Sequence, residues 1–195
     1  MEDATYILSL NLAHSIEAQK KFLSDDEQLQ LFRQAADVVV NAYRRGGRLL
    51  IAGNGGSAAD AQHLAAEFVS KLARDRTPLP AEALTTDSSI LTAIGNDYGF
   101  DHVFSRQIEG KARIGDVFLG ITTSGRSINI INAIDSCKRK GVTSIVFSGR
   151  GGGAVKQIAD ICIVAPGDLT STIQEMHIVL AHSLCETVER ALFPE

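Results

Sequence analysis

Basic charge, cysteine and long apolar runs are all scarce in this 195-residue sequence, and each shortage excludes a class of protein. Nineteen Lys and Arg face 23 Asp and Glu, and no basic block exceeds residues 138–140, which argues against a nucleic-acid partner. No apolar run approaches the roughly 18 residues of a membrane helix, and the N-terminus lacks the pattern of a secretory signal. Three cysteines, without metal-type spacing, fit a reducing compartment. We therefore expect a cytoplasmic protein without a membrane or nucleic-acid partner.

What is present is a regular alternation of helical and strand patterns. Helical periodicity fills residues 6–44 with a break at 24–26, and five short apolar segments follow, each with strand character: 48–52, 83–85, 117–121, 144–147 and 161–164. Helical segments separate and follow them, at 57–72, 88–96, 127–140, shortly after residue 153, and 170–192. This pattern predicts a single α/β domain over residues 1–195, with a doubly wound, flavodoxin-like parallel sheet flanked by helices on both faces and preceded by N-terminal helices.

The loop at residues 53–57, Gly-Asn-Gly-Gly-Ser, follows the first expected strand. Open parallel sheets bind ligands at the carboxyl ends of their strands, where glycines let backbone N–H groups approach an anion. The loop is not a dinucleotide fingerprint, because Ala58 stands where the third glycine belongs, and the lysine of a P-loop is also absent. Tight packing alone is the alternative explanation for its glycines.

A second loop at the same sheet edge, residues 122–127, reads Thr-Thr-Ser-Gly-Arg-Ser. Four hydroxyls and backbone amides at a helix start suit a phosphate monoester, although a serine or threonine there is more often only a helix cap. A third loop, residues 148–153, has a run of glycines but few hydroxyls, and we interpret it as a plain connection. Phosphate binding is therefore expected at residues 122–127.

Polar side chains recur at helical spacing along the segment that begins at Ser57. They are Ser57, Asp60, His63, Glu67 and Lys71. His63 and Glu67 lie one turn apart and form half of a possible divalent-metal site, the alternative being a solvated helix face. The last helix carries Gln174, His177 and His182, and spacing alone does not decide which histidine completes the site or whether either is a core residue.

Five ordered motifs resemble one known family, the sugar isomerase (SIS) domain proteins, and within it the bacterial phosphoheptose isomerases. They lie at residues 53–63 (GNGGSAADAQH), 84–87 (LTTD), 91–97 (LTAIGND), 123–127 (TSGRS) and 173–177 (IQEMH). The resemblance implies a homotetramer, with residues 1–45 used in oligomerisation, since their apolar faces exceed what one core needs. It also implies one zinc per subunit, with His182 chosen over His177; the implied ligands are His63, Glu67, Gln174 and His182.

The same resemblance implies an aldose–ketose isomerase that converts sedoheptulose 7-phosphate, a phosphorylated seven-carbon sugar, to D-glycero-D-manno-heptose 7-phosphate for cell-surface heptose. Glu67 and His182 are the expected proton-handling groups. The expected substrate contacts are Asn54, Gly55, Gly56, Ser57, Glu67, Asn96, Asp97, Thr122, Thr123, Ser124, Ser127 and Gln174. Lys71 and Thr122 depart from the family pattern, which often has Arg and Ser there; a lysine meets a phosphate as a point charge, without the bidentate fork of arginine.

One relative of the same fold is a non-catalytic adaptor that binds the bacterial replication initiator DnaA. The C-terminal Leu-Phe-Pro-Glu and the 173–177 motif also resemble that adaptor. The adaptor lacks the Glu and His that match Glu67 and His182, whereas both are present here. We therefore favour the enzyme and keep the adaptor as the alternative hypothesis.

Overall fold

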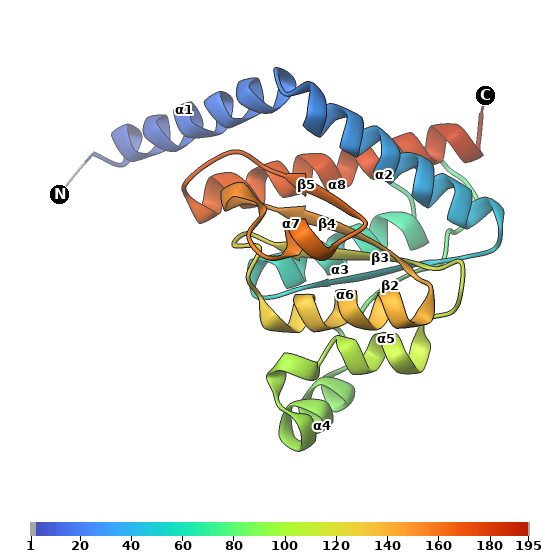
Figure 1. Ribbon diagram of the computed structural model, residues 1–195. Coiled ribbons are helices and arrows are strands. Elements are labelled where there is room, and N and C mark those ends of the chain that lie inside the picture. Colours follow the sequence, from blue (N-terminus) through green and yellow to red (C-terminus); the bar gives the residue numbers. More distant parts are fainter. Residues whose placement is uncertain (1–2, 195) are drawn as a thin grey trace.

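Five parallel strands form one sheet in the computed structural model, which describes residues 3–194 (Figure 1). The strands are β1 (Leu49–Gly53), β2 (Ala81–Ala83), β3 (Val117–Thr122), β4 (Thr143–Ser148) and β5 (Ile161–Val164). They lie in the order β2-β1-β3-β4-β5, with every neighbouring pair parallel. This is the flavodoxin-like order, and the direction of winding reverses between β1 and β3. The predicted doubly wound sheet is confirmed.

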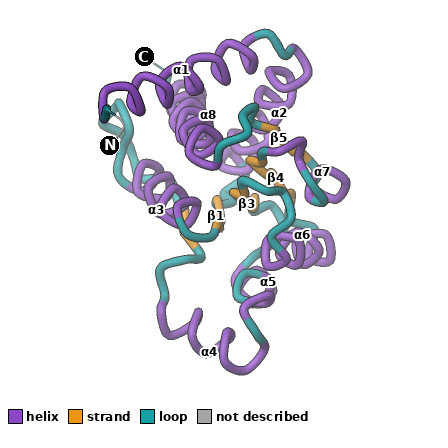
Figure 2. The backbone as a smooth tube through the Cα atoms, turned by 90° about the vertical axis from the view of Figure 1, so that its left-hand side faces the viewer, coloured by secondary structure: helices purple, strands orange, loops and turns teal. Residues whose placement is uncertain are grey.

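Successive residues of a strand point to opposite faces of the sheet, and here the residues on both faces are apolar. Helices therefore cover both faces. On one face lie α2 (Asp26–Arg44), α3 (Gly56–Val69) and α8 (Thr170–Leu192), packed on residues such as Ile51 and Leu119, and α1 (Ala4–Leu23) packs on α2 and α8. On the other lie α5 (Ser105–Lys111), α6 (Ile128–Lys140) and α7 (Val155–Ile158), packed on residues such as Leu50 and Phe118. Figure 2 shows α3 and α8 on one side of the strands, and α5 and α6 on the other.

The N-terminal helices are separated where the sequence predicted a break. Asp25 caps α2 by accepting a hydrogen bond from the Gln28 N–H at 3.1 Å. The first helix buries only Ala18 and Phe22 and extends beyond the sheet (Figure 1). Its large apolar side chains are therefore solvent-exposed in one chain; they are Tyr6, Ile7, Leu8, Leu10, Leu12, Ile16 and Leu23.

The main differences from the sequence predictions are two boundaries and one missed helix. The second strand spans Ala81–Ala83 rather than 83–85, because Ala81 pairs with Leu49 in the parallel register. The helix α3 ends at Val69 rather than 72, because the Arg76 side chain takes its last carbonyls, and Lys71 therefore lies beyond the helix that was predicted to carry it. The short helix α5 was not predicted. Its one buried apolar side chain, Ile108, gives little periodicity.

The helix α4 (Ser88–Tyr98) and the one-turn helix η1 (Phe100–His102) form a protrusion below α5 in Figure 1. Another one-turn helix, η2 (Arg150–Gly152), follows β4. None of the helices from residue 3 to residue 194 is both long and apolar enough to cross a membrane.

Candidate active site

Two helices on the same face of the sheet, α3 and α8, bring three potential metal ligands together. His63 and Glu67 lie one turn apart on α3, and His182 comes from α8, which packs against α3. The Nε2 atoms of His63 and His182 are 2.8 Å apart, and Glu67 Oε1 is 3.4 Å from His63 Nε2. His63 and His182 are 119 positions apart in sequence, so only the packing of the two helices brings them together.

The donor atoms of this cluster fit a divalent metal ion. One ligand atom from each of His63, Glu67 and His182 lies within 4.8 Å of the others. Two imidazole nitrogens and a carboxylate oxygen are a donor set that zinc and other first-row divalent ions accept, and three protein ligands leave a position for substrate or water. The side chain of His63 is 47% exposed, so the site is open to solvent. These residues could hold a metal ion.

Gln174, the predicted fourth metal ligand, lies beside Gly56, where the glycine loop ends and α3 begins. Its amide packs so closely on Gly56 that a β-carbon at that position would collide with it. This contact explains why residue 56 has no side chain, and it places Gln174 beside the N-terminus of α3. The role of Gln174 as a fourth metal ligand stays a prediction.

The two histidines of α8 have different environments. His177 is fully buried, and its Nε2 lies 3.0 Å from the Ser148 carbonyl oxygen, at the end of β4. Burial lowers the pKa of His177 from 6.5 to about 4, and the hydrogen bond to Ser148 opposes this only in part. His177 is therefore a neutral core residue, and the histidine beside His63 is His182.

The hydroxyl loop after β3 holds itself in place through its own side chains. The Oγ1 of Thr122 and the Oγ of Ser127 are 3.0 Å apart, and the Arg126 N–H donates to Ser124 Oγ at 3.2 Å. The loop ends where α6 begins, at Ile128. Three of the four predicted hydroxyls are thus gathered at one helix N-terminus, a place that favours anions; Thr123 is partly buried beside them.

The glycines of residues 149–153, interpreted as a plain connection, support the hydroxyl loop. Gly125 has a φ of +64°, and a β-carbon there would collide with the Gly152 carbonyl. In the same way, Gly153 leaves room only for the backbone of Ser124 and Gly125. Close backbone packing therefore requires these glycines, which the sequence pattern did not indicate.

Asn129 is a site residue that sequence reasoning missed. It is buried in the first turn of α6, and its amide exchanges two hydrogen bonds with the Asn54 amide, each at 2.9 Å. This pair joins the loop after β1 to the first turn of α6, across the point where the winding reverses. An asparagine in a first helical turn carries no signal of its own, because only the neighbouring position of β1 and β3 brings Asn54 to it.

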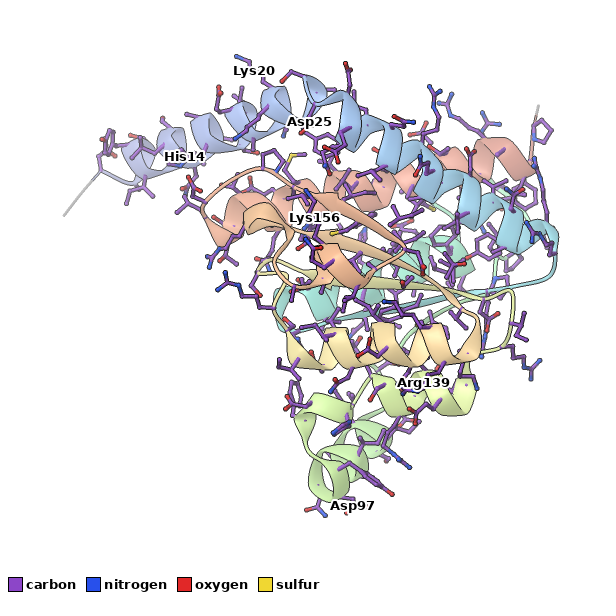
Figure 3. All side chains as sticks on the ribbon, in the orientation of Figure 1. His14, Lys20, Asp25, Asp97, Arg139 and Lys156 are labelled. Carbon is purple, nitrogen blue, oxygen red and sulfur yellow. The ribbon has the colours of Figure 1, made fainter. Side chains whose placement is uncertain are left out.

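Two other predicted contacts lie elsewhere in the chain. Asn96 and Asp97 are exposed near the end of α4, where Asn96 Nδ2 donates to Asp97 Oδ1 at 2.7 Å. Figure 3 shows Asp97 at the tip of the protrusion, away from α8. In a single chain they do not meet the histidine cluster. Ser57 is buried at the start of α3, and its N–H donates to the Asn54 carbonyl at 3.0 Å.

Asp60 lies on the same face of α3 as the cluster. Its Oδ2 is buried without a hydrogen-bond partner in the structure. Burial raises the pKa of the Asp60 carboxyl, while the nearby charge of His63 acts in the opposite direction. Asp60 is thus one of the polar residues at helical spacing that the sequence analysis identified on this helix.

The fold and this site define the class of SIS-domain proteins, whose family model matches residues 13–149. A phosphoheptose isomerase of Aneurinibacillus thermoaerophilus is 50% identical over 188 residues, which cover 96% of this chain and 94% of that protein. "Phosphoheptose isomerase 2" of Campylobacter jejuni is 47% identical over 193 residues, covering 99% of this chain and 96% of that protein. The solved phosphoheptose isomerase of Neisseria gonorrhoeae superposes with a TM-score of 0.89 at 40% identity, covering 96% of this chain and 99% of that one.

The chain therefore belongs to the phosphoheptose isomerases of the SIS-domain family, which are aldose–ketose isomerases. The similarity extends over nearly the whole chain and includes both helices that carry the histidine cluster. It favours the enzyme over the adaptor hypothesis.

Proposed function

We propose that this protein converts sedoheptulose 7-phosphate to D-glycero-D-manno-heptose 7-phosphate and so supplies heptose for cell-surface polysaccharide. The observation that carries the proposal is the convergence of His63, Glu67 and His182, from helices α3 and α8, in one cluster of potential metal ligands. The 50% identity of this chain to a phosphoheptose isomerase, which is an aldose–ketose isomerase, supports the same class of reaction.

The reaction moves one proton from C1 to C2 while the carbonyl and hydroxyl exchange places, through an enediol. One group must carry the proton between the carbons, and another must move a proton between the two oxygens. We assign the first role to Glu67 and the second to His182. The ligand atoms of Glu67 and His182 lie within 4.8 Å of each other, close enough for both groups to act on one substrate.

We propose one zinc per subunit, held by His63, Glu67, Gln174 and His182. When bound, the metal supplies a Lewis acid beside the reacting carbonyl. The support for a metal at this place is the donor set itself, two imidazole nitrogens and one carboxylate oxygen that lie within 4.8 Å of one another. Gln174 would have to reach this point from its place beside Gly56.

The substrate would lie along the carboxyl edge of the sheet, with its phosphate at the hydroxyl loop. Hydroxyls of Thr122, Thr123, Ser124 and Ser127 would donate to the phosphate, since hydrogen bonds to a charged group are the stronger ones. The loop with Asn54, Gly55 and Gly56, together with Ser57 and Gln174, would contact the sugar. Because Asn96 and Asp97 lie on the protrusion, they would reach the hydroxyls of a sugar bound by a neighbouring subunit.

We propose that the assembly is a homotetramer that uses residues 1–45, within a single SIS domain of residues 1–195. The exposed apolar side chains of α1 support this, since faces of this kind are normally covered by a partner. We place the protein in the cytoplasm, where its three buried free thiols, Cys137, Cys162 and Cys185, stay reduced.

The experiment is to incubate purified protein with sedoheptulose 7-phosphate and follow the aldose signal by NMR. Glu67→Gln is the test variant, and Glu109→Gln, which changes an exposed carboxylate on α5 outside residues 1–45, is the matched control that keeps full turnover. Inactive wild-type protein that instead retains DnaA in a pull-down would refute the enzyme and support the adaptor.

A further inference from the structure

Beneath the histidine cluster lies a buried ion pair that connects the two helices of the site. We propose that Arg76 is a positioning residue of the metal site, which sets the spacing of α3 and α8 through the Glu67 carbonyl and the Glu189 carboxylate. This inference rests on the proposed metal site and names residues that lie outside it. The side chain of Arg76 is 1% exposed and that of Glu189 is fully buried.

Arg76 closes the C-terminal end of α3, the end that carries Glu67. Its Nη2 donates to the Glu67 carbonyl oxygen at 2.9 Å, and its Nη1 donates to the Phe68 carbonyl oxygen at 2.6 Å. Carbonyls in the last turn of a helix have no N–H partner within the helix. The guanidinium supplies these partners, so the backbone of Glu67 is held by a side chain from outside the helix.

The same guanidinium is bound to α8. Arg76 Nε donates to Glu189 Oε1 at 2.9 Å, and Glu189 also accepts the N–H groups of Leu72 and Ala73 at 3.1 and 3.3 Å. Burial acts to raise the pKa of Glu189, but these hydrogen bonds and the charge of Arg76 hold it below its usual range. Glu189 lies two helical turns after His182 on α8. Both ligand-bearing helices therefore meet at one ion pair.

A buried ion pair contributes little net stability, because each charge loses its hydration, but it strongly specifies geometry when every polar atom is bonded. Here the pair fixes the ends of α3 and α8 just beyond the ligands. A change in helix spacing would move His182 away from His63 and Glu67, and so change the 2.8 Å separation of the His63 and His182 Nε2 atoms. Loss of groups that orient metal ligands typically weakens metal binding by about 10- to 100-fold.

The test uses Arg76→Lys and Glu189→Gln in the full-length protein. Lysine keeps the charge but is a point donor that lacks the fork needed to bond two carbonyls and a carboxylate together. Glutamine keeps one acceptor oxygen, enough for the Leu72 N–H and Arg76 Nε, but it loses the oxygen that accepts from the Ala73 N–H and removes the charge. This second variant remains informative if Arg76→Lys does not fold. Circular dichroism establishes that each purified variant is folded before metal binding is measured.

Zinc affinity of metal-free protein is measured by competition with a chromogenic chelator, and the absorption bands of bound Co²⁺ report the ligand geometry. We expect both variants to bind zinc about 10- to 100-fold more weakly and to shift the Co²⁺ bands. The matched control is Arg48→Lys. Arg48 bonds Asp116 at 3.3 Å at the start of β1, the opposite end of the strand from the site, so its loss should lower stability and leave zinc affinity unchanged.

The outcomes separate this inference from the function on which it rests. Unchanged zinc affinity and Co²⁺ spectra in both variants would overturn the positioning role while leaving the metal site and the isomerase intact. An equal loss of affinity in Arg48→Lys would show general destabilisation and would also overturn it. Wild-type protein that turns over substrate without retaining zinc would refute the metal site, and this inference with it, but not the isomerase.

Discussion

His177 should make the protein less stable in mild acid, and substitution by glutamine should remove that effect. The imidazole is fully buried, with Nε2 on the Ser148 carbonyl and Nδ1 without a hydrogen-bond partner. Because burial lowers its pKa in the folded chain from 6.5 to about 4, the unfolded chain binds the proton first. Stability from this residue is therefore complete above about pH 6.5 and is lost as pH falls towards about 4.

The size of the effect follows from the difference between the two pKa values. Each pKa unit corresponds to about 1.4 kcal/mol, so the full shift of His177 is worth about 3 kcal/mol. Between about pH 7 and pH 5 roughly 2 kcal/mol of this should be lost. Other groups titrate in the same range, so the useful quantity is the difference between wild type and His177→Gln, in which the amide still donates to Ser148 and does not titrate.

The assay is urea unfolding of both proteins at about pH 7, 6 and 5, at one protein concentration because an oligomer unfolds in a concentration-dependent way. The variant should be less stable at neutral pH, and the gap should narrow by about 2 kcal/mol by about pH 5. If the difference in unfolding free energy between wild type and variant stays the same at every pH, burial does not hold His177 neutral. The reasoning about its environment would then be wrong.

Four further outcomes test the proposed site and assembly. Glu67→Gln keeps the shape of the side chain but removes the base, so kcat should fall by about 10²- to 10⁴-fold with little change in melting temperature. Full turnover by this variant would show that Glu67 is not the base. His182→Asn should lower turnover similarly and also lower the zinc content, because an amide is a weaker zinc ligand than imidazole; unchanged zinc content would contradict its place in the metal site. Ser124→Ala should raise KM through the loss of one or two hydrogen bonds to the phosphate, each worth about 1.5–3 kcal/mol, and an unchanged KM would place the phosphate elsewhere. Sedimentation at micromolar concentration should show a tetramer, and a clean monomer would refute both the assembly and a site shared between subunits.

Much of the fold could be predicted from the sequence because its signals are local. The β5 and α8 boundaries agree with the predicted ranges, since apolar runs and helical spacing involve only neighbouring residues. The failures have non-local causes. The predicted end of α3 was wrong because Arg76, seven residues beyond Val69, takes the helix carbonyls, and α5 was missed because buried polar contacts such as Gln107 with the Leu84 carbonyl hold it in place.

The same division applies to the candidate site. The sequence by itself determined which chemistry is available: a histidine and a carboxylate one turn apart, a hydroxyl loop before a helix, and two further histidines on the last helix. Only the tertiary structure placed His182 beside His63 and buried His177 against Ser148, because residues five apart on one helix face different directions and packing decides what each direction meets. The amide pair of Asn54 and Asn129 likewise exists only because parallel strands distant in sequence end at the same edge of the sheet.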